Sequence, residues 1–137
     1  MDKIHYMSKS NDWETPLELY RNLNTEFGFT LDPCCTKENA KCTKHFTSTE
    51  NGLLQDWGEN IVFMNPPYGG EIYSWMKKAY ESFLNGAVVV CLVPSRTDTK
   101  WWHEFAMRGK IRFLKGRLKF SNSKNSAPFP SAIVVFR

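Results

Sequence analysis

The 137-residue sequence has no long apolar run, and its first residues, Met1 to Tyr6, contain no apolar core of the kind that signal peptides carry. A helix that spans a bilayer needs about 20 consecutive apolar residues, so no membrane segment is expected. We therefore predict a cytoplasmic location, in which the four cysteines are reduced thiols.

Internal repeats and low-complexity tracts are missing as well. A chain of this length buries about two-thirds of the surface that its unfolded form exposes, which is enough for one core. We predict a single domain over residues 1–137, with no second module. Only residues 121–130 are polar and Pro-containing enough for a mobile loop, which we expect to become ordered with substrate.

Acidic residues are scarce in the C-terminal part of the chain. Residues 100–137 hold nine Lys/Arg and one Asp/Glu, a net charge of +8, whereas residues 1–99 hold nine and thirteen, a net charge of −4. Basic residues mixed with aromatic ones are typical of a nucleic-acid-binding surface, although a basic face that only serves solubility has a similar composition. The aromatic residues in this part include Trp101, Trp102, Phe105, Phe113 and Phe120.

The most informative motif is Asn65-Pro66-Pro67-Tyr68, which follows the apolar run 61–64. Because proline fixes φ and has no N–H, a strand over 61–64 must end there. The Asn65 side-chain oxygen and the Pro66 carbonyl can then accept both hydrogens of an exocyclic amino group, while Tyr68 offers a ring face for stacking. Two acceptors would turn the nitrogen lone pair toward an electrophile, which indicates methyl transfer without a covalent intermediate. The alternative is a structural turn between a strand and a helix.

Apolar spacing predicts the elements around this motif. Helices are expected over 16–27, 72–84 and 99–107, with Thr15 and Asp98 as N-caps of the first and the last. Strands are expected over 29–32, 61–64, 87–93 and 131–136, with a hairpin built from 111–114 and 117–120. This alternation predicts an α/β fold with a mostly parallel sheet and helices on both faces, whose ligands bind near the carboxyl ends of the strands.

Two further groups of residues have both a functional and a structural interpretation. A zinc site at Cys34, Cys35, Cys42 and His45 is disfavoured, because adjacent cysteines rarely reach one tetrahedral ion, so small buried thiols and no metal are expected. The polar group Arg96, Asp98 and His103 suits DNA contact, but a helix cap and surface pairing explain it equally well. Of the adjacent Trp101 and Trp102, one is expected to face outward, where it could stack on a base.

Six short segments, spread over nearly the whole chain, together resemble the phage-type DNA N6-adenine methyltransferases, a Dam-like family whose wider class carries an Asp/Asn-Pro-Pro-Tyr/Phe/Trp motif. Each segment alone is unspecific, and the set carries the resemblance. The segments are Trp13-Glu14-Thr15-Pro16, Leu31-Asp32-Pro33-Cys34, Glu38-Asn39-Ala40-Lys41-Cys42, Gly52-Leu53-Leu54-Gln55-Asp56-Trp57, Asn65-Pro66-Pro67-Tyr68-Gly69 and Val93-Pro94-Ser95-Arg96-Thr97-Asp98-Thr99.

The resemblance implies a compact domain with a Rossmann-like sheet that binds S-adenosylmethionine, and transfer of its methyl group to the N6 amino group of adenine in DNA. For a protein encoded by a phage or prophage, the expected location is the cytoplasm of the bacterial host. The residues placed around the cofactor by the resemblance are Trp13, Thr15 and Pro16 near its methionine part, Asp32, Pro33, Cys34 and Asn65 along its pocket, and Asp56 near its adenine moiety.

Adenine must leave the duplex for this reaction, because its amino group lies against the partner base. Stacking on Tyr68 and hydrogen bonds to Asn65 and Pro66 would offset the few kcal/mol that flipping costs. No general base is needed, since the nitrogen attacks the methyl group first and its proton can leave afterwards to solvent. The residues expected to contact phosphates are Arg96, Arg108, Lys110, Arg112, Lys115, Arg117 and Lys119.

Two features depart from the wider class of methyltransferases. The glycine-rich loop usual after the first strand is replaced by Asp32-Pro33-Cys34-Cys35, as in the phage-type family, and no segment is long enough for a separate target-recognition domain. Sequence preference on DNA is therefore expected to be relaxed or short.

Two other functions stay open on the sequence. One is methylation of a protein glutamine, because release-factor methyltransferases also grip an amide nitrogen with Asn-Pro-Pro-Tyr, although the basic C-terminal part argues against a peptide substrate. The other is a non-catalytic single-strand binding module, in which the proline corner is only structural. Binding of S-adenosylmethionine separates the enzymes from the binding module.

Overall fold

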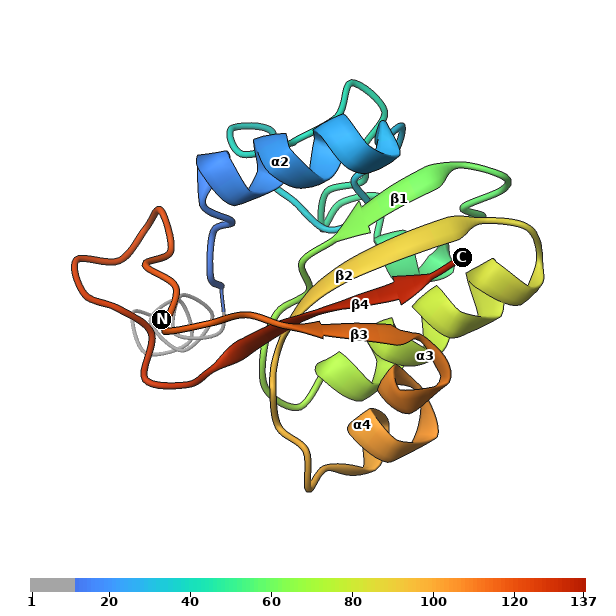
Figure 1. The fold of residues 1–137 in the computed structure, drawn as a ribbon. Coiled ribbons are helices and arrows are strands. Elements are labelled where there is room, and N and C mark those ends of the chain that lie inside the picture. The colour runs from blue at the N-terminus through green and yellow to red at the C-terminus, as the bar shows by residue number, and fades with distance from the viewer. Residues whose placement is uncertain (1–11) are drawn as a thin grey trace.

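The structure, a computed structural model, describes residues 12–137 and has a four-stranded sheet at its centre (Figure 1). The strand order is β1-β2-β4-β3, with bounds Ile61–Met64, Val88–Pro94, Ser131–Phe136 and Lys110–Phe113 in that order. Strands β1 and β2 are parallel, whereas β4 is antiparallel to both β2 and β3. The expectation of a mostly parallel sheet is therefore wrong. Strand β4 starts beside the end of β2, at the pair Pro94 and Ser131, and so must run in the opposite direction.

The three predicted helices are present, with differences at two of their starts. Helix α2 spans Leu17–Phe27, α3 spans Ile72–Leu84 and α4 spans Lys100–Glu104, and two 3-10 turns, η1 and η2, span Gly52–Leu54 and Ala106–Arg108. The long helix expected over 99–107 is thus divided at Phe105, which leaves helical geometry. Thr99, and not Asp98, caps α4. Thr15 does not cap α2, whose N-cap is Pro16, because its hydroxyl contacts Asn65 instead.

Two predicted strands differ from the structure. The strand expected over 29–32 is reduced to two isolated parallel bridges, Leu31 with Val62 and Asp32 with His45. The hairpin expected from 111–114 and 117–120 is wrong, because β3 pairs with β4 instead. Residues 117–120 form no strand, since the Leu118 carbonyl is bonded by Ala127 of the following loop.

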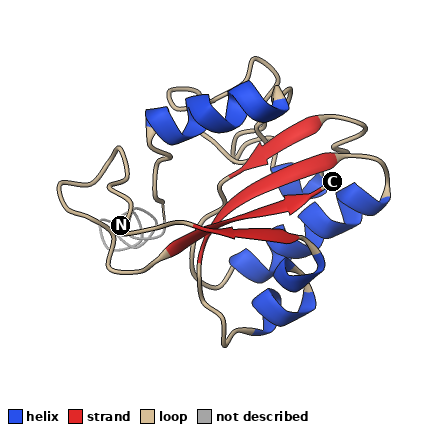
Figure 2. Ribbon diagram, in the orientation of Figure 1, coloured by secondary structure: helices blue, strands red, loops and turns tan. Residues whose placement is uncertain are grey.

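The helices cover both faces of the sheet, as predicted (Figure 2). Phe63 of β1 packs against Tyr20 of α2, with ring centroids 5.2 Å apart. On the other face, Phe136 of β4 packs against Tyr80 and Phe83 of α3, at 5.8 and 6.0 Å. These faces alternate along each strand, as side chains in a sheet must. Within residues 12–137, no helix has the length and apolar character needed to cross a bilayer.

The ends of the strands bring several connections to one edge of the sheet. Strands β1, β2 and β3 all finish there, and β4 begins there. Figure 1 shows the loop 114–130 and the first described residues lying at this edge. Parallel α/β sheets bind ligands at such an edge. The functional site is therefore expected at this edge.

Candidate active site

The side-chain amide of Asn65, directly after β1, is held by the first described residues of the chain. Its Nδ2 donates to the carbonyl oxygen of Trp13 and to the hydroxyl oxygen of Thr15, the latter at 3.0 Å. A carbonyl oxygen can only accept a hydrogen bond, so the bond to Trp13 fixes which end of the amide is the nitrogen. Both amide hydrogens are used, and the oxygen Oδ1 must point elsewhere.

This Oδ1 is buried and has no hydrogen-bond partner among residues 12–137. A buried acceptor left unpaired costs about 1–3 kcal/mol, so such an atom in a folded protein requires an explanation. Because the Trp13 carbonyl and the Thr15 hydroxyl accept from Nδ2, the amide cannot rotate to bring Oδ1 to another partner without losing these bonds. An N–H group of a ligand would satisfy the oxygen. No hydrogen bond from the described residues ends on the carbonyl of Pro66, so the next residue of the chain offers a second acceptor.

Tyr68 is buried beneath the loop 114–130, and only 2% of the residue is exposed. Its hydroxyl donates to the Leu92 carbonyl of β2 at 3.2 Å, and burial raises its pKa well above the usual range. Its ring is covered by Phe120 and Phe129, with centroids 6.2 and 5.7 Å away. The ring face expected to be open for stacking is thus occupied by two other aromatic side chains in this structure.

Asp32 lies at the same edge, at the parallel bridge that extends the sheet beyond β1. Its two carboxylate oxygens accept from the backbone N–H groups of Cys34 and Lys41, at 3.3 and 3.0 Å. Burial raises its pKa to about 6, against the lowering effect of these hydrogen bonds. The adjoining Pro33 carbonyl packs against Gly52, where a Cβ atom would come within 2.0 Å of its oxygen. The backbone at Pro33 is therefore fixed by a glycine of η1.

Further carboxylates surround this edge. Burial raises the pKa of Asp12, and the charges of Glu71 and Glu14 raise it further. Burial, followed by the charges of Asp32 and Asp12, raises the pKa of the Cys34 thiol. Burial is the larger cause of both shifts, and the neighbouring negative charges add to it. Asp12, Glu14 and Glu71 therefore lie close to one another at this edge.

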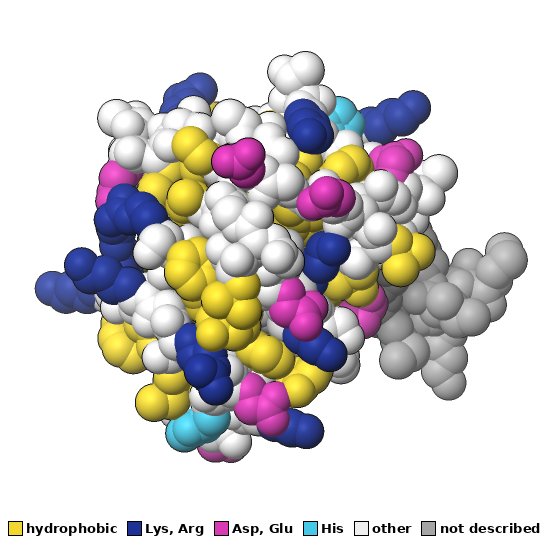
Figure 3. Space-filling view, turned by 90° about the vertical axis from the view of Figure 1, so that its right-hand side faces the viewer, with side chains coloured by type: hydrophobic (Ala, Val, Ile, Leu, Met, Phe, Trp, Pro, Cys, Tyr) yellow, Lys and Arg dark blue, Asp and Glu magenta, His cyan; other side chains and the backbone are white. Residues whose placement is uncertain are grey.

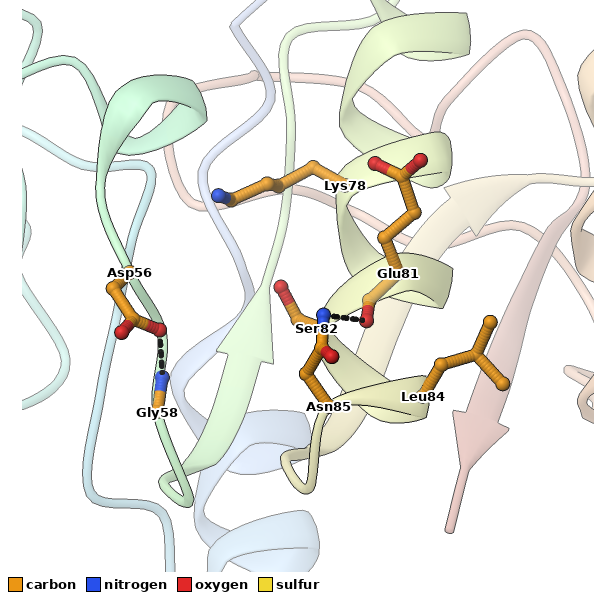
Figure 4. A pocket seen from close by; sticks show the side chains of 7 residues that line it. All are labelled: Asp56, Gly58, Lys78, Glu81, Ser82, Leu84 and Asn85. Atoms are coloured by element: carbon orange, nitrogen blue, oxygen red, sulfur yellow. Dashed lines mark hydrogen bonds between the residues drawn. The ribbon is translucent and has the colours of Figure 1, made fainter.

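Asp56, which the resemblance places near the cofactor, is not brought to this group. It is exposed, and its carboxylate accepts from the Gly58 N–H at 2.8 Å in a local turn. Figure 4 shows it across a groove from Lys78 of α3 and from Asn85, the residue that follows this helix, whereas α3 begins shortly after the proline corner. Asp56 thus lies toward the opposite edge of the sheet.

The seven basic residues expected to contact phosphates divide into two groups. Four lie at the site edge. One is Arg96, whose guanidinium is 5.7 Å from the centroid of the Phe129 ring. The other three are exposed and follow the carboxyl end of β3: Lys115, Arg117 and Lys119. The other three lie on β3 or before it. These are Arg108, over the Tyr80 ring, exposed Lys110, and Arg112, which forms a bidentate ion pair with Glu26 at 2.6 and 2.7 Å.

The face on the right of Figure 1 is not uniformly basic. Figure 3 shows basic and acidic side chains mixed with hydrophobic ones across it.

Near α4, the His103 ring bonds the Thr97 carbonyl at 2.7 Å. Trp101 and Trp102 are both buried, at 5% and 3% exposure, so the expectation that one of them faces outward is wrong. Helix α4 contacts α3, and the Trp102 ring centroid lies 5.6 Å from that of Trp101 and 6.2 Å from that of Phe113 in β3.

Cysteine side chains at this edge have local partners. The Cys42 sulfur lies 3.7 Å from the Tyr20 hydroxyl, and the His45 ring bonds the carbonyls of Cys42 and Thr43. Within the described part of the chain, no three His, Cys, Asp or Glu side chains are grouped closely enough to hold a metal ion.

Three contributors to the site carry no local signal in the sequence. Phe129 and Asn122 come from the loop expected to be mobile, which instead packs on the proline corner. The Phe129 ring covers Tyr68, and its centroid also lies 5.1 Å from that of the Trp13 ring. Asn122 bonds the backbone on both sides of Trp13. The resemblance places Thr15 near the cofactor but does not reveal that its hydroxyl contacts Asn65. These pairs are more than 45 residues apart, so spacing could not reveal them.

A family model described as DNA N-6-adenine-methyltransferase (Dam) matches residues 5–136, a range that contains every described residue of the site. The chain belongs to the DNA N-6-adenine-methyltransferase (Dam) family. This confirms the resemblance drawn from the six sequence segments. Of the three functions left open by the sequence, the Dam family supports the methylation of DNA adenine.

Two curated relatives of this Dam family chain carry methyltransferase names. One is the DNA N-6-adenine-methyltransferase of Haemophilus phage HP1 (strain HP1c1), 28% identical over 129 residues, which cover 86% of this chain and 75% of the phage protein. The other is the Escherichia coli (strain K12) protein YfdM, named as a methyltransferase, 38% identical over 72 residues, which cover 47% of this chain and 79% of that protein.

Proposed function

We propose that this protein transfers a methyl group from S-adenosylmethionine to the N6 amino group of adenine in DNA, with Asn65 Oδ1 as the acceptor that holds this amino group. Membership of the Dam family supports the reaction and the substrate. The buried, unpaired Oδ1 is the observation that supports the role of Asn65.

The residues at the site edge fit the proposed cofactor. S-adenosylmethionine carries a sulfonium and an ammonium group, and the neighbouring carboxylates of Asp12, Glu14 and Glu71 would attract these positive groups. When bound, the cofactor supplies an electrophilic methyl group. We assign its binding to Trp13, Thr15 and Pro16 on one side and to Asp32, Pro33 and Cys34 on the other. Asp56 is left out, because it lies toward the opposite edge.

In the reaction, Asn65 Oδ1 and the Pro66 carbonyl accept the two hydrogens of the adenine amino group. These bonds draw the nitrogen out of conjugation with the ring and aim its lone pair at the methyl group. The Asn65 acceptor is preorganised, since Trp13 and Thr15 already hold the other end of its amide. Pro67 keeps the corner rigid, and the proton leaves to solvent after transfer.

Tyr68 forms the floor of the base pocket in this proposal. Phe120 and Phe129 must move aside before a flipped adenine can stack on its ring. The same loop carries Lys115, Arg117 and Lys119, which we assign to DNA phosphates together with Arg96. Arg108, Lys110 and Arg112 are left with a structural or long-range electrostatic role.

The proposal also covers the type of sheet and the place in the cell where the protein acts. The parallel bridge between Leu31 and Val62, next to the parallel pair β1 and β2, is consistent with a Rossmann-like sheet whose first strand is reduced to two residues. Since one relative is a phage enzyme, we infer that the protein acts in the cytoplasm of a bacterial host.

The test is incubation of the purified protein with duplex DNA and S-adenosylmethionine labelled in its methyl group, followed by nucleoside analysis. The label is expected in N6-methyldeoxyadenosine. A parallel incubation with bacterial release factors is read by amino-acid analysis. Label in a glutamine there, or saturable DNA binding without any transfer, would instead support one of the two functions left open by the sequence.

A further inference from the structure

Asn122, in the loop between β3 and β4, clamps the backbone on both sides of Trp13. Its Oδ1 accepts from the Glu14 N–H at 2.9 Å, and its Nδ2 donates to the Asp12 carbonyl at 2.8 Å. The neighbouring Ser121 adds a hydrogen bond from its N–H to the Glu14 carbonyl at 2.9 Å. The loop between β3 and β4 thus fixes the backbone of residues 12–14, more than 100 residues away in sequence, and Trp13 of this segment in turn accepts from Asn65.

The bond to Glu14 has a consequence for the Trp13 carbonyl. The Trp13 carbonyl and the Glu14 N–H belong to one peptide unit, which is planar, so that fixing the direction of one fixes the other. In a trans unit the two groups point in opposite directions. Asn122 therefore bonds one side of this unit, and Asn65 bonds the other.

We propose that Asn122 is a positioning residue for methyl transfer: through the Trp13–Glu14 peptide unit, it orients the carbonyl that sets the Asn65 amide. This inference rests on the function proposed above. If the peptide unit were free to turn, the Asn65 amide could turn with it and present N–H groups to the adenine amino group. Donors would then face donors, and the nitrogen would lose the acceptor that directs its lone pair.

The kinetic test replaces Asn122 by Ala and uses Asn125→Ala, an exposed position in the same loop, as the matched control. We expect Asn122→Ala to lower kcat about 10- to 100-fold while the KM values for S-adenosylmethionine and DNA change less than about threefold. Asn125→Ala should leave both unchanged. A raised KM with an unaltered kcat would overturn the inference, since it would show that Asn122 only holds a binding segment.

A second readout is independent of turnover. The side-chain amide of Asn65 gives two ¹⁵N–¹H signals, which are assigned by their loss in Asn65→Ala. In the wild type both hydrogens are bonded, so slow solvent exchange is expected, and Asn122→Ala should speed this exchange about tenfold or more. Unchanged Asn65 signals in Asn122→Ala would overturn the inference. Asn122→Ser, whose side chain is too short to reach both backbone groups, replaces Asn122→Ala if the latter does not fold.

The two readouts separate this inference from the proposed function. Altered Asn65 signals in Asn122→Ala, without adenine methylation by the wild type, would support the positioning role and contradict the reaction. Adenine methylation by the wild type, with the kcat and Asn65 signals of Asn122→Ala unaltered, would contradict the positioning role alone.

Discussion

Thr15 illustrates how a residue can serve a distant side chain instead of the helix that it precedes. Its hydroxyl oxygen accepts one of the two Asn65 amide hydrogens, and its side chain is 4% exposed. We predict that Thr15→Val, which keeps the shape and removes the hydroxyl, slows methyl transfer about 3- to 10-fold, the equivalent of one hydrogen bond. Single-turnover kinetics would measure this. Thr15→Ser keeps the oxygen and should retain the wild-type rate, and equal rates for Val and Ser would contradict the role.

Gly52 is required by the close approach of Pro33. A Cβ atom at this position would lie 2.0 Å from the Pro33 carbonyl oxygen and 3.2 Å from the Trp75 ring. We predict that Gly52→Ala lowers the free energy of unfolding by about 1–3 kcal/mol through overpacking. Urea unfolding would measure it.

Gly70 provides the control for this substitution, since a Cβ atom there meets nothing within 4 Å. Gly70→Ala should change the free energy of unfolding by less than about 0.5 kcal/mol. Equal stability of the two variants would show that the backbone at Pro33 can move far enough to make room for a Cβ atom at position 52.

At the residue scale, only those features of the site that depend on residues adjacent in the chain could be predicted from the sequence. The prolines after Asn65 place its side chain at the end of a strand, and this is visible in four consecutive letters. The partners Trp13 and Thr15 are about 50 residues away, so the orientation of the amide could not be predicted. For the same reason Asn122 carried no signal.

At the scale of elements, periodicity predicted the buried segments well and the basic segment poorly. Helix α3 and strand β4 have the predicted bounds, because their apolar faces are decided by their own residues. The strand expected over 117–120 fails because its alternation of Arg, Leu, Lys and Phe says nothing about which backbone will pair with it. β4, buried along its whole length, is the partner that β3 takes.

The segment after β3 can be tested as the DNA-contacting element. We predict that Lys115→Glu with Arg117→Glu weakens DNA binding at least about tenfold at low salt and lowers the slope of log affinity against log salt by about two, since two phosphate contacts are lost. Titration of duplex DNA at several salt concentrations would measure this.

The matched control is Arg108→Glu with Lys110→Glu, which changes the net charge equally at the other end of β3. Its affinity should stay within about threefold of the wild type, because only long-range attraction is altered. If both pairs weakened binding alike, overall charge and not the site edge would decide DNA binding.

At the scale of the whole molecule, the enzyme, a Dam family member, has the carboxylates of Asp12, Glu14 and Glu71 at its site edge and basic residues on the adjoining loop. The sequence shows the same charges as an acidic and a basic part of the chain. It could not show that the two parts meet at one edge, because that depends on β4 returning antiparallel beside β2.

The buried carboxylate of Asp32 makes stability depend on pH. Its pKa rises from an ordinary value of 3.8 to about 6 on folding, so the folded protein binds this proton more tightly than the unfolded chain. The stabilisation is complete below pH 3.8 and is lost as the pH rises through about 6. The whole effect is on the order of 3 kcal/mol.

We therefore predict that the stability difference between the wild type and Asp32→Asn shifts in favour of Asn as the pH is raised from 4 to 7.5. Urea unfolding of both proteins at the two pH values would measure this shift, and the other carboxylates cancel in the comparison. A difference independent of pH would show that Asp32 is not buried as a proton-binding group.

The most direct test of the role of Asn65 is the single-turnover rate of methyl transfer to adenine in Asn65→Ala, with Asn85→Ala at the exposed end of α3 as the control. We predict a rate lower by about 100-fold or more, with S-adenosylmethionine bound nearly as tightly as by the wild type, because a preorganised acceptor for the amino group is lost. Asn85→Ala should transfer at the wild-type rate. A wild-type rate in Asn65→Ala would contradict the account.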